Sequence, residues 1–105
     1  MKLVVDADGA VALVEPEDLK RFKLELTDPT MPPERLEAAL SGIGSLDRHD
    51  TAWIREASLR RMGESAGCGP DWQEALGGMI GFASKHGWIN ATGDIRVHIE
   101  RATPA

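Results

Sequence analysis

Residues 2–14 read KLVVDADGAVALV, two short apolar runs on either side of an Asp-Gly pair. An Asp-Gly pair in this setting is the strongest short-range signal of a β-hairpin. With these two residues as the turn, Leu3 faces Val14 across the hairpin. Lys2 then meets Glu15 at the open end, an ion pair that supports this register. Most positions on both faces are apolar, so the sequence predicts that other elements cover both faces.

Residues 88–100 predict a second hairpin, which turns at the run ATGD. After the turn, apolar and polar residues alternate, so this strand is expected to have one apolar face and one solvent-exposed face. Whether TG or GD forms the centre of the turn stays open, but both choices put Trp88 on the face of Val97 and Ile99. Residues 101–105 are expected to be a frayed tail.

The sequence between the two hairpins predicts one strand and three helices. Residues 22–26 alternate between apolar and polar, as in a half-buried strand. Helices are predicted from about Pro33 to the glycines at 42 and 44, from Thr51 to Met62, and from Pro70 to His86, with a polar loop over 45–50. The glycine at 63 is expected to end the second helix.

The last helix is the best marked, but it contains glycines at positions 77, 78 and 81. A glycine inside a helix costs about 1 kcal/mol relative to alanine. We therefore expect that these glycines are present for packing, because they let another backbone approach this face of the helix closely.

These elements predict one α+β domain over residues 1–105. Its sheet is expected to be small and mainly antiparallel, built from the two terminal hairpins and strand 22–26, with about three helices packed on it. Helices of this length cover only part of the apolar surface of such a sheet.

The composition of the 105 residues narrows the class of protein, because the net charge is −5 and no apolar run reaches the ~20 residues of a membrane helix. Only a few apolar residues follow Lys2, so no secretory signal is predicted. The single cysteine is consistent with a reducing cytoplasm. Residues 1–50 hold 11 acids and 6 bases, and residues 51–105 hold 6 of each. The sequence therefore predicts an acidic cytoplasmic protein without a membrane or nucleic-acid partner.

Cys68 is the candidate for a reactive thiol. It precedes the helix predicted at Pro70, and the positive end of a helix dipole favours a thiolate. A nucleophile also needs a base, and His49 or His86 would have to reach it in space. Since most lone cysteines are inert, no catalytic residue is assigned. His86 and His98 fit no metal motif, and neither a metal nor a cofactor is predicted.

A ligand pocket is predicted between helix 70–86 and hairpin 88–100. Trp72 and Trp88 bracket the helix and could line such a pocket, although aromatic residues at helical spacing are more often core. Arg96 or His98 beside them could hold an anionic group.

Two classes of function follow from these observations. The first is a non-catalytic interaction or structural domain that binds a protein partner or self-associates, burying the N-terminal hairpin or the glycine-marked helix face in a homo-oligomer. The alternative is a small-molecule-binding protein or small enzyme that uses the predicted pocket. An enzymatic activity is left open, and the absence of a nucleophile-elbow or phosphate-loop sequence makes it the less favoured reading.

Overall fold

The computed structural model describes residues 1–102 as three helices and one six-stranded sheet. Residues 103–105, most of the tail predicted over 101–105, lie outside the described residues, and Arg101 is the last residue of the final strand. In chain order the elements are β1 (Lys2–Val5), β2 (Val11–Val14), β3 (Lys23–Leu26), α1 (Pro33–Leu40), β4 (Gly44–Arg48), β5 (Thr51–Ile54), α2 (Glu56–Ser65), α3 (Pro70–Lys85) and β6 (Ile95–Arg101).

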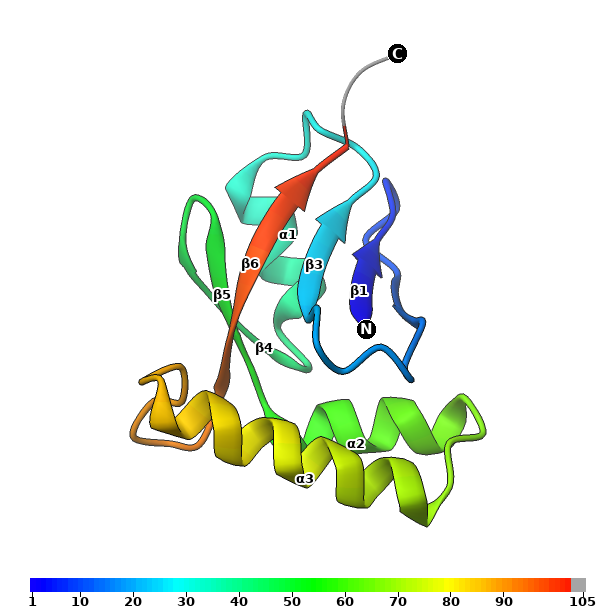
Figure 1. Cartoon of the computed structure of the whole chain (residues 1–105). Coiled ribbons are helices and arrows are strands. Elements are labelled where there is room, and N and C mark those ends of the chain that lie inside the picture. The colour runs from blue at the N-terminus through cyan, green and yellow to red at the C-terminus, as the bar shows by residue number, and fades with distance from the viewer. Residues whose placement is uncertain (103–105) are drawn as a thin grey trace.

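The α+β class is confirmed, but the sheet is mixed and larger than predicted. Its strand order is β2-β1-β3-β6-β5-β4, with β1, β3 and β6 parallel in the middle and the outer strands antiparallel to their neighbours. The parallel pairs arise because β2 returns on the outside of β1. Segment 15–22 then brings the chain back to start β3 in the same direction as β1 (Figure 1).

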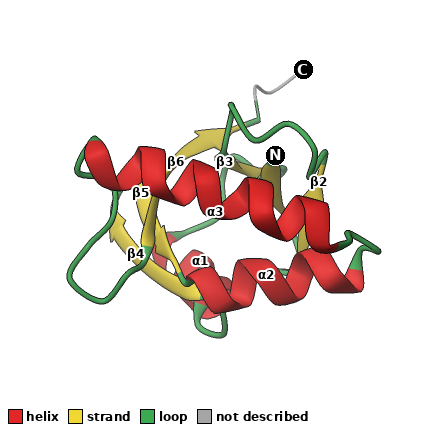
Figure 2. Cartoon of the chain, turned by 60° about the horizontal axis from the view of Figure 1, so that its bottom comes forward, coloured by secondary structure: helices red, strands yellow, loops and turns green. Residues whose placement is uncertain are grey.

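One face of the sheet and all three helices enclose the core. In Figure 1, α1 lies behind the sheet, whereas α2 and α3 cross the end where β1, β3 and β6 begin. Figure 2 shows α2 and α3 side by side. The strands contribute buried residues that are adjacent in register, and each helix adds leucines; the main members are Leu3, Val5, Leu24, Leu26, Val97, Ile99, Leu36, Leu40, Leu59 and Leu76.

The opposite face of the sheet is polar, and Figure 1 shows no helix in front of it. Lys2 pairs with Glu25 at 3.1 Å, and Lys23 donates a hydrogen bond to Glu100 at 2.8 Å. This bond raises the pKa of Lys23 and lowers the pKa of Glu100. The expectation that both faces of the N-terminal hairpin are covered is therefore wrong. Its second face continues into charged neighbours that favour water, and Val4 there is only half-buried.

Both hairpin turns contain one residue more than predicted. In the first turn, Asp6 Oδ1 accepts backbone N–H bonds from residues 8 and 10, and Gly9 has a φ of +86°. This is a three-residue loop with glycine in the left-handed position rather than a two-residue Asp-Gly turn. Leu3 therefore faces Leu13, and the predicted register is wrong by one residue.

The second turn has the same construction. Asn90 Oδ1 accepts backbone N–H bonds from residues 92 and 94, and Gly93 has a φ of +83°. The Arg96 N–H donates to the Trp88 carbonyl at 2.8 Å, so Trp88 lies on the face of Arg96 and not on that of Val97. The predicted parity is wrong because the loop is longer. The first arm of this hairpin contributes only an isolated bridge to β6.

Residues 44–54 form the β4–β5 hairpin, where a loop and the start of a helix were expected. Thr51, Ala52 and Ile54 are buried because β5 lies between β4 and β6 in the sheet. Pairing on both sides and β-branched side chains outweigh the helical spacing of this segment. Helix α2 consequently begins only at Glu56.

The tight helix crossing occurs at a different glycine from those expected. Gly63 does not end α2 but lies inside it, where an added Cβ would stand 2.2 Å from the indole ring of Trp72 in α3. In contrast, an added Cβ at Gly78 or Gly81 would meet nothing within 4 Å. The close approach is thus between α2 and α3 at Gly63, and the glycine-marked face of α3 has no such contact within the described chain.

Candidate functional site

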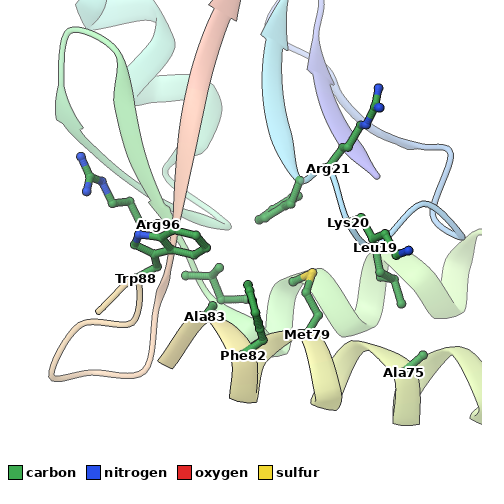
Figure 3. A pocket seen from close by; sticks show the side chains of 11 residues that line it. Leu19, Lys20, Arg21, Ala75, Met79, Phe82, Ala83, Trp88 and Arg96 are labelled. Carbon is green, nitrogen blue, oxygen red and sulfur yellow. The ribbon is translucent and has the colours of Figure 1, made fainter. Parts of the chain in front are cut away.

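A groove of about 690 Å³ lies along one side of α3 and includes residues of both helix 70–86 and hairpin 88–100, between which a pocket was predicted. Its opposite walls are the segment before β3 and the residues that begin β6 (Figure 3). This volume is within the range of small-molecule sites. The lining residues are Leu19, Lys20, Arg21, Phe22, Ala75, Met79, Phe82, Ala83, Trp88, Ile95 and Arg96.

Two exposed aromatic side chains mark this groove. Phe82 is 57% exposed and Trp88 is 42% exposed, and they are the large hydrophobic residues of the described chain that remain exposed. The imidazole of His86 stacks on Trp88 with 4.8 Å between ring centroids and lies 4.4 Å from the ring of Phe82. A helix turn and the loop after it thus hold three rings together at the surface, where they offer an apolar contact for a ligand.

The charges that line the groove are all positive. Lys20, Arg21 and Arg96 contribute them, and within residues 1–102 none of these three side chains forms an ion pair. Figure 3 shows the guanidinium groups of Arg21 and Arg96 extending away from the apolar side chains, on opposite sides. The groove therefore has an apolar floor and a cationic rim, in a protein whose net charge is −5.

Two of the four predicted ligand-binding residues meet here, and two do not. Trp88 and Arg96 both line the groove. Trp72 is instead part of the helix packing, and its Nε1 donates a hydrogen bond to the Pro16 carbonyl at 2.7 Å. His98 is exposed on the polar face of β6, one strand repeat beyond Arg96, and does not line the groove.

The wall formed by residues 19–22 was not predicted from the sequence. The run LKRF combines apolar and cationic residues just before β3, and this pattern was the available signal. This pattern indicates a wall of the groove only once the fold is known, because the fold places the start of β3 beside α3. Phe82 was missed because it lies outside the apolar stripe that defines the inner face of the helix.

Cys68 lies in the turn between α2 and α3, with its backbone N–H bonded to the Gly63 carbonyl at 2.9 Å. His86 is at the other end of α3, ~24 Å away along a helix of 16 residues. His49 is in the β4–β5 turn, on the opposite side of the molecule (Figure 1). The structure does not bring either candidate base to this thiol.

None of the helices within residues 1–102 has the length and apolar character needed to cross a membrane. In comparisons with models of protein families, with curated proteins and with solved structures, nothing matches this chain.

Proposed function

We propose that the protein is a non-catalytic binding domain that holds a small amphipathic anion in the groove beside α3. The ligand class is a carboxylate with an alkyl or aryl body. The observation that carries this proposal is the combination, in one groove, of exposed Phe82 and Trp88 with cations that have no ion-pair partner among residues 1–102.

The chemistry of the lining supports each half of this ligand. Phe22, Met79 and Phe82 can cover an apolar body, and burial stabilises such a body by roughly 25 cal/mol per Å². A guanidinium group such as that of Arg96 prefers a carboxylate, with which it forms two parallel hydrogen bonds. No carboxylate lines the groove to compete for these cations.

A binding role is favoured over catalysis because of what the lining contains. The eleven residues include no carboxylate, thiol, hydroxyl or imidazole, and their one amine, that of Lys20, is exposed to solvent rather than desolvated as a catalytic lysine would be. The arrangement can select a ligand by shape and charge, which is the work of a carrier or sensor domain.

Titration of the protein with decanoate, monitored by the fluorescence of its tryptophans, tests this proposal. Decyltrimethylammonium has an alkyl chain of nearly the same length with the opposite charge and serves as the matched ligand. Decanoate is expected to bind at least tenfold more tightly. Equal affinity for the two ligands would contradict the proposal.

Charge-neutralising variants locate the binding site. Arg96→Gln is expected to weaken decanoate binding about tenfold, or about 1.4 kcal/mol, because the paired hydrogen bonds of this exposed guanidinium to the carboxylate are lost. Arg48→Gln is the matched control, since Arg48 is an exposed cation on β4 outside the groove. If both variants weaken binding equally, the effect is one of net charge and the groove is not the site.

A further inference from the structure

The two edges of the sheet differ in how they are protected against another strand. Edge strand β4 carries Asp47 and Arg48 and has a register irregularity between Leu46 and Arg48. Charges and bulges are the usual means by which an edge strand avoids pairing with a further chain. Edge strand β2 (Val11–Val14) reads VALV and has neither. Its outer side therefore remains open to strand addition.

The backbone of β2 leaves defined groups free. The first turn pairs residue 6 with residue 10 by a hydrogen bond, and bonded pairs alternate along an antiparallel ladder. Ala12 and Val14 therefore bond to β1. Val11 and Leu13 direct their N–H and C=O groups outward, where an added strand would accept and donate hydrogen bonds.

A second groove, of about 440 Å³, lies between β2 and α2. The side chains of Val11 and Leu13 form one wall, on the same face of the sheet as the core residues opposite them in β1. The other lining residues come from α2 and the turn before β4, and are Gly42, Ile43, Ser58, Arg61, Met62, Ser65 and Ala66. A strand added to β2 would direct alternate side chains into this groove.

Ser58, in the lining of this groove, has a hydroxyl group without a hydrogen-bond partner. The residue is 3% exposed, and within the described chain its Oγ makes no hydrogen bond. Buried hydroxyl groups are normally paired, and an orphaned one calls for an explanation. Rotation of this side chain toward the groove would let a bound ligand group supply the missing partner. Arg61, exposed in the same lining, forms no ion pair with the other described residues and adds a positive charge.

We propose that an extended peptide segment of a partner protein adds to the sheet along β2, with an apolar and an acidic side chain directed into the groove beside α2. Main-chain hydrogen bonds to Val11 and Leu13 would hold it, as in other strand-addition sites. Its apolar side chain contacts Leu13 and Met62, and its carboxylate meets Arg61 and Ser58. This site is separate from the groove beside α3 and does not depend on the function proposed for that groove.

The charge and length of β2 favour such a peptide over a second copy of the chain. An antiparallel β2–β2 pair would bring Glu15 of each copy toward the acidic first turn of the other, and these like charges would repel. Four residues also form a short contact for a dimer, whose interface normally buries at least ~1,000 Å² in total. A short peptide needs only the main-chain bonds and one filled pocket.

Selection of random heptapeptides displayed on phage, with the full chain as bait, tests the proposal. The enriched peptides are expected to alternate apolar and other residues and to contain an acid at one fixed position. The amide signals that shift when a selected peptide binds should lie in β2, in residues 42–43 and in α2. A selection that enriches no such pattern, or shifts confined to other elements, would overturn the proposal.

Three variants make this result specific. Val11→Pro removes an outward N–H at the first residue of an edge strand, a position that tolerates proline, and should weaken peptide binding at least tenfold. Val11→Ala is its matched control and should weaken binding no more than about threefold. Ser58→Ala should raise the melting temperature while weakening peptide binding, because it removes an unpaired hydroxyl that the peptide uses.

A lower melting temperature of Ser58→Ala would show that the hydroxyl has a partner within the protein and would contradict the argument. Sedimentation tests whether a second copy of the chain, rather than a peptide, pairs with β2. A dimer of the wild-type chain that Val11→Pro converts to a monomer would assign β2 to self-association and overturn the peptide proposal.

Discussion

The two grooves on the flanks of the α2–α3 pair are built from different parts of the chain. The groove beside α3 has exposed rings at Phe82 and Trp88 in its lining and only cations among its charged groups. The groove beside α2 is bordered by a free strand edge and contains one arginine and a buried, unpaired hydroxyl at Ser58.

These contrasting linings determine which ligand each surface can recognise. Side chains that surround an apolar floor recognise a compact molecule by its shape and charge. A strand edge recognises another backbone, and the adjoining groove then selects among side chains. Under the two proposals, one small fold has two kinds of binding surface, and both lie beside the packed helices α2 and α3.

The largest expected effect comes from breaking that shared packing. Gly63→Val would place side-chain atoms where the Trp72 ring lies, since even a Cβ would be 2.2 Å from it. Overpacking of this kind costs about 3 kcal/mol, so urea should unfold the variant at a much lower midpoint. Both grooves should lose their ligands together. Unchanged stability would show that α2 and α3 can separate without disturbing the core.

The next effect should separate the two grooves. Phe82→Ala removes an exposed ring from the groove beside α3 and should weaken decanoate binding about tenfold, or about 1.4 kcal/mol. Because Phe82 is 57% exposed, the melting temperature should change little. Binding of a selected peptide beside β2 should be unaffected, as measured by calorimetry. A parallel loss of both ligands would mean that the two grooves are not independent.

A smaller effect of opposite sign is expected at Gly78. This residue lies inside α3, and an added Cβ there would meet nothing within 4 Å, so Gly78→Ala should stabilise the protein by about 1 kcal/mol. Chemical denaturation measures the change, and decanoate affinity should remain as in the wild type. Loss of stability would indicate that the glycine face contacts another molecule in solution.

The smallest effect concerns the polar face of the sheet, which belongs to neither groove. Lys23→Met removes the hydrogen bond that lowers the pKa of Glu100, so this pKa should rise toward its ordinary value of 4.5 in a carbon-detected NMR titration. Because the pKa of Glu100 is lower in the folded protein than its ordinary value of 4.5, the hydrogen bond stabilises the protein fully at a pH above that value. That contribution is lost as the pH falls through the folded pKa.

Lys85→Met is the control for this titration, because Lys85 lies in the last turn of α3 and not beside Glu100. The pKa of Glu100 should keep its lowered value in this variant. An unchanged pKa in Lys23→Met as well would mean that the ion pair is not formed in solution.

Sequence patterns predicted the local elements of this fold where a single signal dominated. The helix at 70–85 has apolar spacing and a proline start, and strand 23–26 has clean alternation, and both are confirmed. The strand at 51–54 could not be recognised because its burial comes from pairing with β6, more than 40 residues away in the sequence. The predicted length of both turns was wrong because a side chain, that of Asp6 or Asn90, stabilises the longer loop.

The candidate site was predictable only in part, for a related reason. Trp88 and Arg96 are close in sequence and both were predicted to lie near the last helix, but the predicted hairpin placed them on opposite faces, and only the longer turn brings them to the same face. Lys20 and Phe22 join them only because the parallel pairing of β1, β3 and β6 brings the start of β3 to α3. Contacts between distant segments depend on the sheet order, which local periodicity does not encode.

Mapping decanoate onto the ¹⁵N-labelled protein by NMR is the sharpest test of the groove beside α3. We expect saturable shifts of the Trp88 indole N–H and of the amides of residues 19–22 and 79–83, with those of β2 unchanged. Decyltrimethylammonium should produce no comparable shifts at the same concentration. Equal shifts with both ligands, or shifts spread over β2 and the polar sheet face, would contradict an anion-selective groove.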